Sequence, residues 1–99
     1  MPHRKIAFGE MAWTQGGHPL ERKKSDGSVT MLEFAVGFED PNWCERSHVG
    51  LVLSGEFSLR FEDGDVAYAA GDCFVVDAGV RHRAWNAGEV ATTLFVVSG

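Results

Sequence analysis

The sequence predicts an all-β fold, a sandwich or small barrel built from short strands. Three observations favour it: runs rich in Val, Phe, Leu and Thr lie between Gly-containing turns, residues 57–62 alternate apolar and polar side chains, and no convincing helical pattern occurs. The chain has 99 residues, of which 44% are hydrophobic. This is enough for one packed core, so we expect a single domain over residues 1–99.

Seven runs are the expected strands. The clearest is 56–62, where Phe57, Leu59 and Phe61 would face the interior and the intervening polar residues the solvent. The sequence "EDGD" at 62–65 is typical of a turn that closes a hairpin. In chain order, the expected strands cover 29–38, 48–54, 56–62, 66–70, 73–76, 81–85 and 90–97.

The N-terminal part of the chain carries a weaker pattern. The basic cluster "ERKK" at 21–24 precedes the turn-like "SDGS" and is expected to be a solvated loop. The segment "KIAFGEMAWT" at 5–14 is apolar but breaks at Gly9, so we expect an edge strand, on its own barrel or across to a second subunit. Because a second subunit would also cover aromatic surface, we expect a homodimer.

Composition argues against several classes of protein. The net charge of −5 argues against a nucleic-acid partner, since phosphate binding needs clustered Lys and Arg. No window approaches 18 consecutive apolar residues and nothing resembles a targeting segment, so we expect no membrane partner and a cytoplasmic location. Cys44 and Cys73 are then expected to be free thiols.

The stretch "GDCFVVDAGVRHRAWN" at 71–86 has a distinctive spacing. Gly71, Asp77, Gly79, His82 and Asn86 are separated by five, one, two and three residues. This spacing resembles the second signature of the cupin superfamily, in which proline usually stands at the position of Asp77.

The stretch "HVGLVLSGEF" at 48–57 resembles the end of the first cupin signature, in which an acidic residue precedes a strand and a glycine follows after six residues. Gly55 matches that glycine, and His48 stands at the acidic position. Together the two signatures cover residues 41–86. The resemblance implies a small double-stranded β-helix, or jelly-roll, cupin barrel that is open at one end and often dimeric.

The resemblance also implies where a metal would bind. In metal-binding cupins, two histidines and the acid of the first signature join the histidine of the second around one divalent ion. His82 matches a ligand position, and His48 replaces the acid with another good ligand type. The two-histidine element is missing from this sequence.

Cys44 is a candidate replacement ligand. If the three residues between Cys44 and His48 form a hairpin loop, the two residues face each other with Cβ atoms about 4.5–5.5 Å apart, and Asn42 shares the face of Cys44. With the family's longer spacing, Pro41 and Trp43 stand at the two histidine positions instead, and neither binds metal. The sequence leaves this register open.

With the family's shorter spacing, Asn42 and Cys44 stand at the two histidine positions, and Cys44, His48 and His82 form a thiolate and two-imidazole set. Such a set suits Zn, Fe, Cu or Ni better than Mg or Ca. The alternative is a metal-free pocket in which both histidines hydrogen-bond to neighbours. The further residues expected to line the pocket are Asn42, Trp43, Val52 and Asn86.

Three functions stay open. The first is a divalent-metal-dependent enzyme of the oxygenase or isomerase type that acts on a small molecule. The second is a binding or sensing module that holds a small molecule without metal and without turnover. The third is a barrel kept for a protein contact. The sequence fixes neither the small molecule nor whether the protein is catalytic, because a fold does not determine a function.

Overall fold

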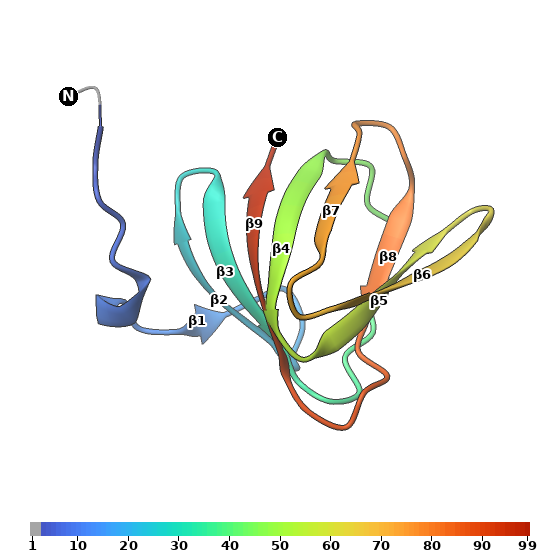
Figure 1. Cartoon of the computed structure of the whole chain (residues 1–99), viewed down its shortest axis with the longest axis horizontal. Coiled ribbons are helices and arrows are strands. Elements are labelled where there is room, and N and C mark those ends of the chain that lie inside the picture. The colour runs from blue at the N-terminus through green and yellow to red at the C-terminus, as the bar shows by residue number, and fades with distance from the viewer. Residues whose placement is uncertain (1–2) are drawn as a thin grey trace.

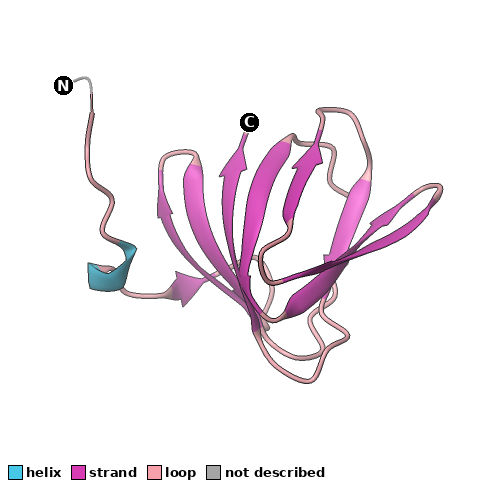
Figure 2. Ribbon diagram, in the orientation of Figure 1, coloured by secondary structure: helices cyan, strands magenta, loops and turns pink. Residues whose placement is uncertain are grey.

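Two antiparallel sheets face each other in the structure, which is a computed structural model and describes residues 3–99 (Figure 1). The sheets meet at the lower edge of the view and stand apart at the upper edge. Figure 2 shows that strands and loops form almost the whole molecule. The predicted all-β, jelly-roll type of fold is confirmed. No helix among residues 3–99 has the length and apolar character to cross a membrane.

The larger sheet has six strands in the order β1-β2-β3-β9-β4-β7. The smaller sheet has three strands in the order β6-β5-β8. The only helix in the described part of the chain is a 3₁₀ turn, η1 (Phe8–Glu10). The strands are β1 (Thr14–Gln15), β2 (Glu21–Asp26), β3 (Val29–Phe34), β4 (His48–Ser54), β5 (Glu56–Phe61), β6 (Gly64–Ala69), β7 (Cys73–Val76), β8 (His82–Trp85) and β9 (Thr92–Ser98).

The seven expected strands correspond to β3 to β9, with small differences at their ends. The largest difference is at β3, which ends at Phe34 because Gly37, with φ of 86°, turns the chain away from the sheet. The β5–β6 hairpin closes at 62–65 as expected, with Phe61 opposite Gly64. Gly55, which matches the glycine of the first signature, has φ of 77° in the turn between β4 and β5.

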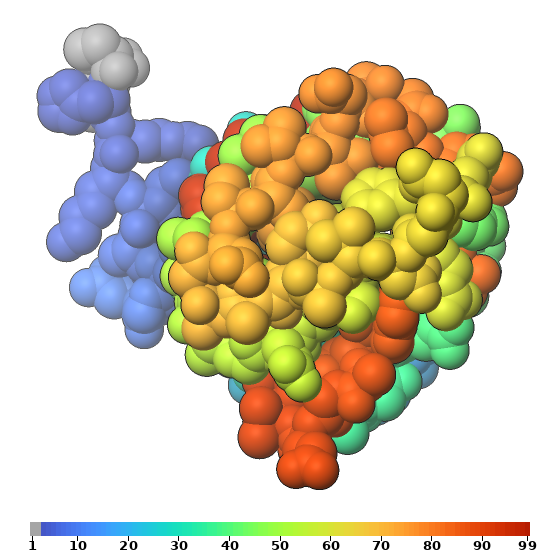
Figure 3. Space-filling view, turned by 45° about the vertical axis from the view of Figure 1, so that its right-hand side comes forward, coloured from blue at the N-terminus to red at the C-terminus, as the bar shows by residue number. Residues whose placement is uncertain are grey.

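Two expectations for the N-terminal part are wrong in detail. Residues 21–24 belong to strand β2, whose charged side chains are stabilised across the ladder by the ion pair of Arg22 with Glu33 at 2.7 Å. The expected edge strand over 5–14 shrinks to β1, because residues 8–10 form the 3₁₀ turn instead. Figure 3 shows this N-terminal arm standing off the compact body.

The core lies between the two sheets and is built from alternating strand residues. Phe34 and Phe38 stack at 4.2 Å with nearly parallel rings, and Phe57 meets Phe34 edge-on at 5.9 Å. A Cβ at Gly50 would overlap the Phe74 ring, so the glycine in β4 makes room for a core aromatic. The remaining buried apolar residues are Val52, Leu59, Val76, Ala84, Leu94 and Val96.

Candidate metal centre

The backbone of residues 38–44 runs beside β8 and brings Cys44 to the wide end of the barrel. Cys44 and His82 exchange two backbone hydrogen bonds of 2.8 and 3.0 Å. Further along, the amide of Asp40 donates to the carbonyl of Ala84 at 2.8 Å. Three residues separate Asp40 from Cys44, whereas one residue separates Ala84 from His82. Residues 41–43 therefore bulge out of the ladder, which suits Pro41 because it has no N–H to donate.

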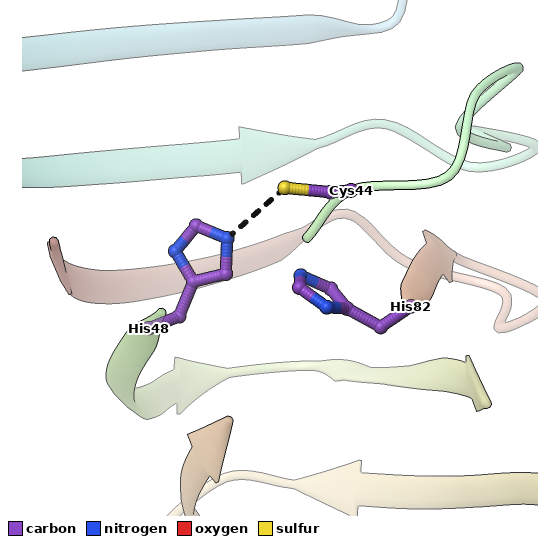
Figure 4. Close-up of side chains that lie close together, drawn as sticks. All are labelled: Cys44, His48 and His82. Carbon is purple, nitrogen blue, oxygen red and sulfur yellow. Dashed lines mark hydrogen bonds between the residues drawn. The ribbon is translucent and has the colours of Figure 1, made fainter. Parts of the chain in front are cut away.

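Three side chains converge at this end of the barrel (Figure 4). One nitrogen from each of His48 and His82 and the sulfur of Cys44 lie within 4.8 Å of one another. Cys44 Sγ is 3.6 Å from His48 Nε2, and the two imidazole rings meet edge-on with centroids 5.0 Å apart. His48 begins β4 and His82 begins β8, so both sheets contribute to the cluster.

His82 has one ring nitrogen bound and one free. Its Nδ1 donates to the carbonyl of Val80 at 2.8 Å, which requires the proton to be on Nδ1. Its Nε2 is buried and is the one buried side-chain N or O atom within residues 3–99 that has no hydrogen-bond partner. A metal ligand has this arrangement, because the bond made by one nitrogen fixes the tautomer and leaves the lone pair of the other available.

His48 is oriented in a similar way. Its Nδ1 lies 2.9 Å from the hydroxyl of Ser98, and its Nε2 faces Cys44. Burial lowers the pKa of His48 below its ordinary value, and the neighbouring His82 and Arg46 lower it further. The shift favours the neutral imidazole, which is the form that binds a metal.

A cavity of about 220 Å³ adjoins the three side chains and extends between the sheets. Its walls are mainly apolar, and its polar lining consists of Glu21, Asp40, Cys44, His48 and His82. Burial raises the pKa of the Asp40 carboxyl, against the lowering effects of a hydrogen bond from the Ala84 backbone and of the charges of Arg83, His82 and His18. The volume lies below the roughly 300–1,000 Å³ of drug-sized pockets, so the cavity fits a small molecule.

The structure brings the three expected metal ligands together but by a different route. The hairpin pairing of Cys44 with His48 does not occur: Cys44 pairs with His82 in the backbone, and His48 pairs with Val76 and Ser98. The hairpin loop is therefore wrong, although the short distance between Cys44 and His48 is present. The reason is the bulge at 41–43, which shifts the ladder before Cys44.

The four expected pocket residues lie outside the lining of this cavity. Asn42 is exposed in the bulge. Trp43 lies under the guanidinium groups of Arg81 and Arg83, 5.0 and 5.6 Å from its ring centre. Val52 and Asn86 are buried at 1% exposure each, within the packed part of the barrel.

Three polar residues of the site were missed by sequence reasoning. Glu21 and Asp40 line the cavity, and Ser98 holds His48. Asp40 belongs to the same stretch as Cys44, so its proximity in sequence was an available signal. Glu21 and Ser98 reach the site through the pairing of β2, β3, β9 and β4, which no local pattern specifies.

Comparison with known proteins identifies the fold family. Residues 30–98 match the family model described as "Cupin domain". The match spans more than half of the chain and includes both stretches that resemble the cupin signatures. No curated protein sequence matches the chain.

Solved structures share this architecture at low sequence identity. A sugar phosphate isomerase of the cupin superfamily from Silicibacter pomeroyi is 17% identical with a TM-score of 0.78, over 96% of this chain and 74% of its own. The polyketide cyclase RemF from Streptomyces resistomycificus is 18% identical with a TM-score of 0.77, over 97% and 78%. The CENP-C cupin domain from Drosophila melanogaster is 18% identical with a TM-score of 0.74, over 92% and 77%. At such identities the likeness shows the fold alone.

Proposed function

The chain belongs to the cupin superfamily, and from this premise we propose that it is a metal-dependent enzyme that acts on a small molecule. The proposed metal ligands are Cys44, His48 and His82, and the proposed substrate site is the adjoining cavity. The observation that carries the proposal is the buried, unpartnered Nε2 of His82, because a buried polar atom without a partner costs about 1–3 kcal/mol. A bound ion would remove that cost.

The distance between Cys44 Sγ and His48 Nε2 fits a transition metal. With zinc bonds of about 2.3 Å to sulfur and 2.0–2.1 Å to nitrogen, a tetrahedral site separates the two ligand atoms by about 3.6 Å. Cys44 Sγ and His48 Nε2 are 3.6 Å apart. Two imidazoles and a thiolate suit Zn, Fe, Cu or Ni, and the choice among them depends on metal supply as much as on the site.

Each residue around the centre has a defined task in this proposal. Val80 and Ser98 hold the two imidazoles through Nδ1, so that Nε2 of His82 is left without a partner and Nε2 of His48 is turned toward Cys44. The mainly apolar walls would contact the apolar part of a substrate, and the Asp40 carboxyl, whose pKa is raised by burial, would hold or release a proton. A bound divalent ion would supply Lewis acidity. An isomerase or oxygenase reaction is consistent with these parts, and the solved structures that share the fold include a sugar phosphate isomerase and a polyketide cyclase.

Metal reconstitution tests the proposal. Protein purified without an affinity tag would be stripped with chelator and reloaded with Zn²⁺, Ni²⁺ or Co²⁺, and we expect one equivalent by elemental analysis. Co²⁺ should also give a thiolate charge-transfer band. Cys44→Ser should abolish the band, whereas the matched control Cys73→Ser, at an exposed position on β7, should keep it. A content far below one equivalent after reloading would overturn the proposal.

A metal-free binding module is the second candidate. It is favoured by the direct contact between Cys44 Sγ and His48 Nε2, which gives two of the three donors a partner without any ion. In this case the cavity would hold a small molecule without turnover. A ligand screen by thermal shift on the stripped protein, compared with the reloaded protein, separates the two candidates. Ligands that stabilise both forms equally would support the metal-free module.

We also propose that two chains pair through the outer face of the larger sheet. Val49 is exposed there and lies between Val75 of β7 and Val97 of β9, which are exposed too. An apolar patch of this kind on a small domain is typical of an interface. Val75→Asp should give a monomer in sedimentation experiments, and Val90→Asp, at an exposed position outside the strands, is the control. A monomeric mass for the unaltered chain would overturn the pairing.

The proposed thiolate ligand also bears on location. Cys44 and Cys73 are both free in the structure. A ligand thiol must stay reduced, so we propose that the protein works in a reducing compartment such as the cytoplasm. Loss of bound metal on mild oxidation, reversed by a thiol reductant, would support this dependence. Retention of the metal after complete oxidation of Cys44 would contradict it.

A further inference from the structure

The backbone register beside β8 decides which side chain lies opposite His82. Glu39 is bridged to Trp85, and Cys44 is bridged to His82. If the ladder ran without a break from Trp85 to His82, Asn42 would stand opposite His82 instead. The alternation of side chains does not decide between Asn42 and Cys44, because they are two residues apart and alternation has a period of two. The choice therefore needs a contact that belongs to the observed register.

The two registers differ in the ligand that they offer to a metal. The observed register brings Cys44 Sγ to 3.6 Å from His48 Nε2 (Figure 4). In the unbroken ladder the amide of Asn42 would stand there, and Cys44 would lie opposite Val80. A thiolate is a much better ligand for Zn, Cu or Ni than a side-chain amide. The register thus determines the chemistry of the site.

Arg83 holds the bulge of residues 41–43 at both of its ends. Its Nε and Nη2 donate to the backbone carbonyl of Asp40, directly before the bulge, at 3.0 and 2.7 Å. The same guanidinium lies over the ring of Trp43, the last residue of the bulge, 5.6 Å from the ring centre. One planar group therefore connects the start of the bulge with the residue that precedes Cys44.

The hydrogen bonds to Asp40 replace a bond of the regular ladder. In an unbroken antiparallel ladder, Asp40 and Ala84 would exchange two backbone hydrogen bonds. In the structure, the amide of Asp40 donates to Ala84 at 2.8 Å, whereas the carbonyl of Asp40 accepts the two N–H groups of Arg83. Hydrogen bonds from an ionised donor are stronger than those between neutral groups. The ladder is thus interrupted at the point where Arg83 binds.

We propose that Arg83 is the positioning residue that selects Cys44 over Asn42 as the side chain opposite His82. Arg83 does not line the cavity and acts through the bulge that it holds. The inference deepens the proposed function and rests on it for the role of Cys44 as a metal ligand. It also gives a task to Trp43, whose ring is the surface on which the guanidinium lies.

Hydrogen exchange followed by NMR tests the register in the stripped, isotope-labelled protein. The amide of Cys44 donates to the carbonyl of His82 at 2.8 Å, and this bond exists only in the bulged register. In Arg83→Gln we expect the Cys44 amide to exchange faster, by a factor at least about 10-fold larger than any acceleration at the amides of β9. Equal acceleration at Cys44 and in β9 would make Arg83 merely structural and overturn the inference, as would an unchanged rate at Cys44.

Arg81→Gln is the matched control. Arg81 lies over the same ring of Trp43, 5.0 Å from its centre, and pairs with Glu62 at 3.5 Å. Within residues 3–99 its guanidinium makes no hydrogen bond to the bulged segment, so Arg81→Gln should leave the exchange rate at Cys44 unchanged. An acceleration equal to that in Arg83→Gln would overturn the inference.

Arg83→Lys separates the planar group from its charge. Lysine keeps the positive charge but lacks the rigid fork that donates two N–H groups from one plane. We expect the Cys44 amide to exchange as fast in Arg83→Lys as in Arg83→Gln. Full restoration of the slow rate by lysine would show that charge alone suffices and would overturn the role assigned to the hydrogen bonds with Asp40.

Metal readouts connect the register with the ligand. In Arg83→Gln the Co²⁺ thiolate band should weaken and Zn²⁺ affinity should fall by about 10-fold or more, whereas Arg81→Gln should keep both. A normal thiolate band in Arg83→Gln would overturn the inference and leave the metal-dependent function intact. Absence of metal binding in the unaltered chain would refute the metal-dependent function, and the exchange rate at Cys44 would still decide whether Arg83 sets the register.

Discussion

A buried polar side chain stands at the first residue of strand β8 and another directly after its last, and the two differ in how completely they are hydrogen-bonded. Asn86 is 1% exposed, donates to two backbone carbonyls, and accepts the N–H of Gly88 at 2.9 Å. His82 is 4% exposed and makes one side-chain hydrogen bond, to the carbonyl of Val80 at 2.8 Å. Its other nitrogen has no partner.

This difference separates a structural polar residue from a functional one. The cost of burying a polar group is offset when all its hydrogen bonds are made, as they are at Asn86. The narrow end of the barrel is closed in this way, with Phe34 and Phe38 stacked beside it. At the wide end, His82 Nε2 has no hydrogen-bond partner, and His82 lines the cavity. This arrangement is expected where a ligand completes the site.

The largest expected effect is a loss of unfolding free energy when the hydrogen bonds at the narrow end of the barrel are removed. Asn86→Leu keeps the approximate volume but leaves the carbonyls of Phe34 and Val90 and the amide of Gly88 without their partner. At about 1–3 kcal/mol for a buried group left unpaired, the loss of unfolding free energy should be about 3 kcal/mol or more. Urea denaturation measures it.

Metal content in Asn86→Leu should stay at the level of the unaltered chain wherever the variant is folded. The sequence had suggested a different role, in which Asn86 lines the pocket. A loss of less than about 1 kcal/mol together with a loss of ligand binding would restore that role and remove the contrast between the two ends.

The second-largest expected effect is a loss of Zn²⁺ affinity when a proposed ligand at the wide end of the barrel is removed. His82→Ala removes the atom that has no partner together with one hydrogen bond, to the carbonyl of Val80, so it should lower the unfolding free energy of the stripped protein by clearly less than Asn86→Leu does. The affinity for Zn²⁺, measured by competition with a chelating dye, should fall by at least about 100-fold, since loss of a ligand exceeds the 10–100-fold cost of losing its supporting partner. Destabilisation equal to that of Asn86→Leu would make His82 structural.

Local sequence patterns were sufficient for most of the fold. The alternation at Phe57, Leu59 and Phe61 and the glycine turns specify strands β3 to β9, because each pattern is a property of neighbouring residues. Strand β2 was missed since its charged residues resemble a solvated loop. The structure accommodates these residues through the ion pair of Arg22 with Glu33 across the ladder and the stacking of Arg22 and Lys24 on Trp13.

The three candidate metal ligands could be predicted from the sequence, but the backbone pairing that brings them together could not. Cys44, His48 and His82 were identified from spacing and family resemblance, and the structure places them together. The backbone partner of Cys44 was not, because the bulge at 41–43 depends on how the segment lies against β8. Glu21 and Ser98 join the site through the pairing of segments distant in sequence, which no local spacing encodes.

A smaller effect is expected from the residue that orients His48. Ser98→Ala removes the hydroxyl 2.9 Å from Nδ1 and frees the imidazole to adopt another tautomer or rotamer. Zn²⁺ affinity should fall by about 10-fold, with little change in unfolding free energy. Ser54→Ala, at an exposed position at the other end of β4, is the control. An unchanged affinity in Ser98→Ala would show that the ring is held by packing alone.

The smallest expected effect is a dependence of stability on pH, which arises from titrating groups at the wide end of the barrel and not from Asn86. Burial and the neighbouring His82 and Arg46 lower the pKa of His48 in the folded state, so the unfolded chain takes up a proton at higher pH than the folded chain does. Stability of the stripped protein should therefore fall as the pH drops below the ordinary histidine pKa of about 6.5.

Asp40 acts in the opposite direction, because its pKa is raised in the folded state and its protonation on acidification favours the folded chain. The comparison of variants separates the two. His48→Gln should flatten the fall in stability between about pH 7 and pH 5, whereas Asn86→Leu should give a curve parallel to that of the unaltered chain, because no titrating group is removed. Parallel curves for all three proteins in urea denaturation across that range would show that His48 carries no such coupling.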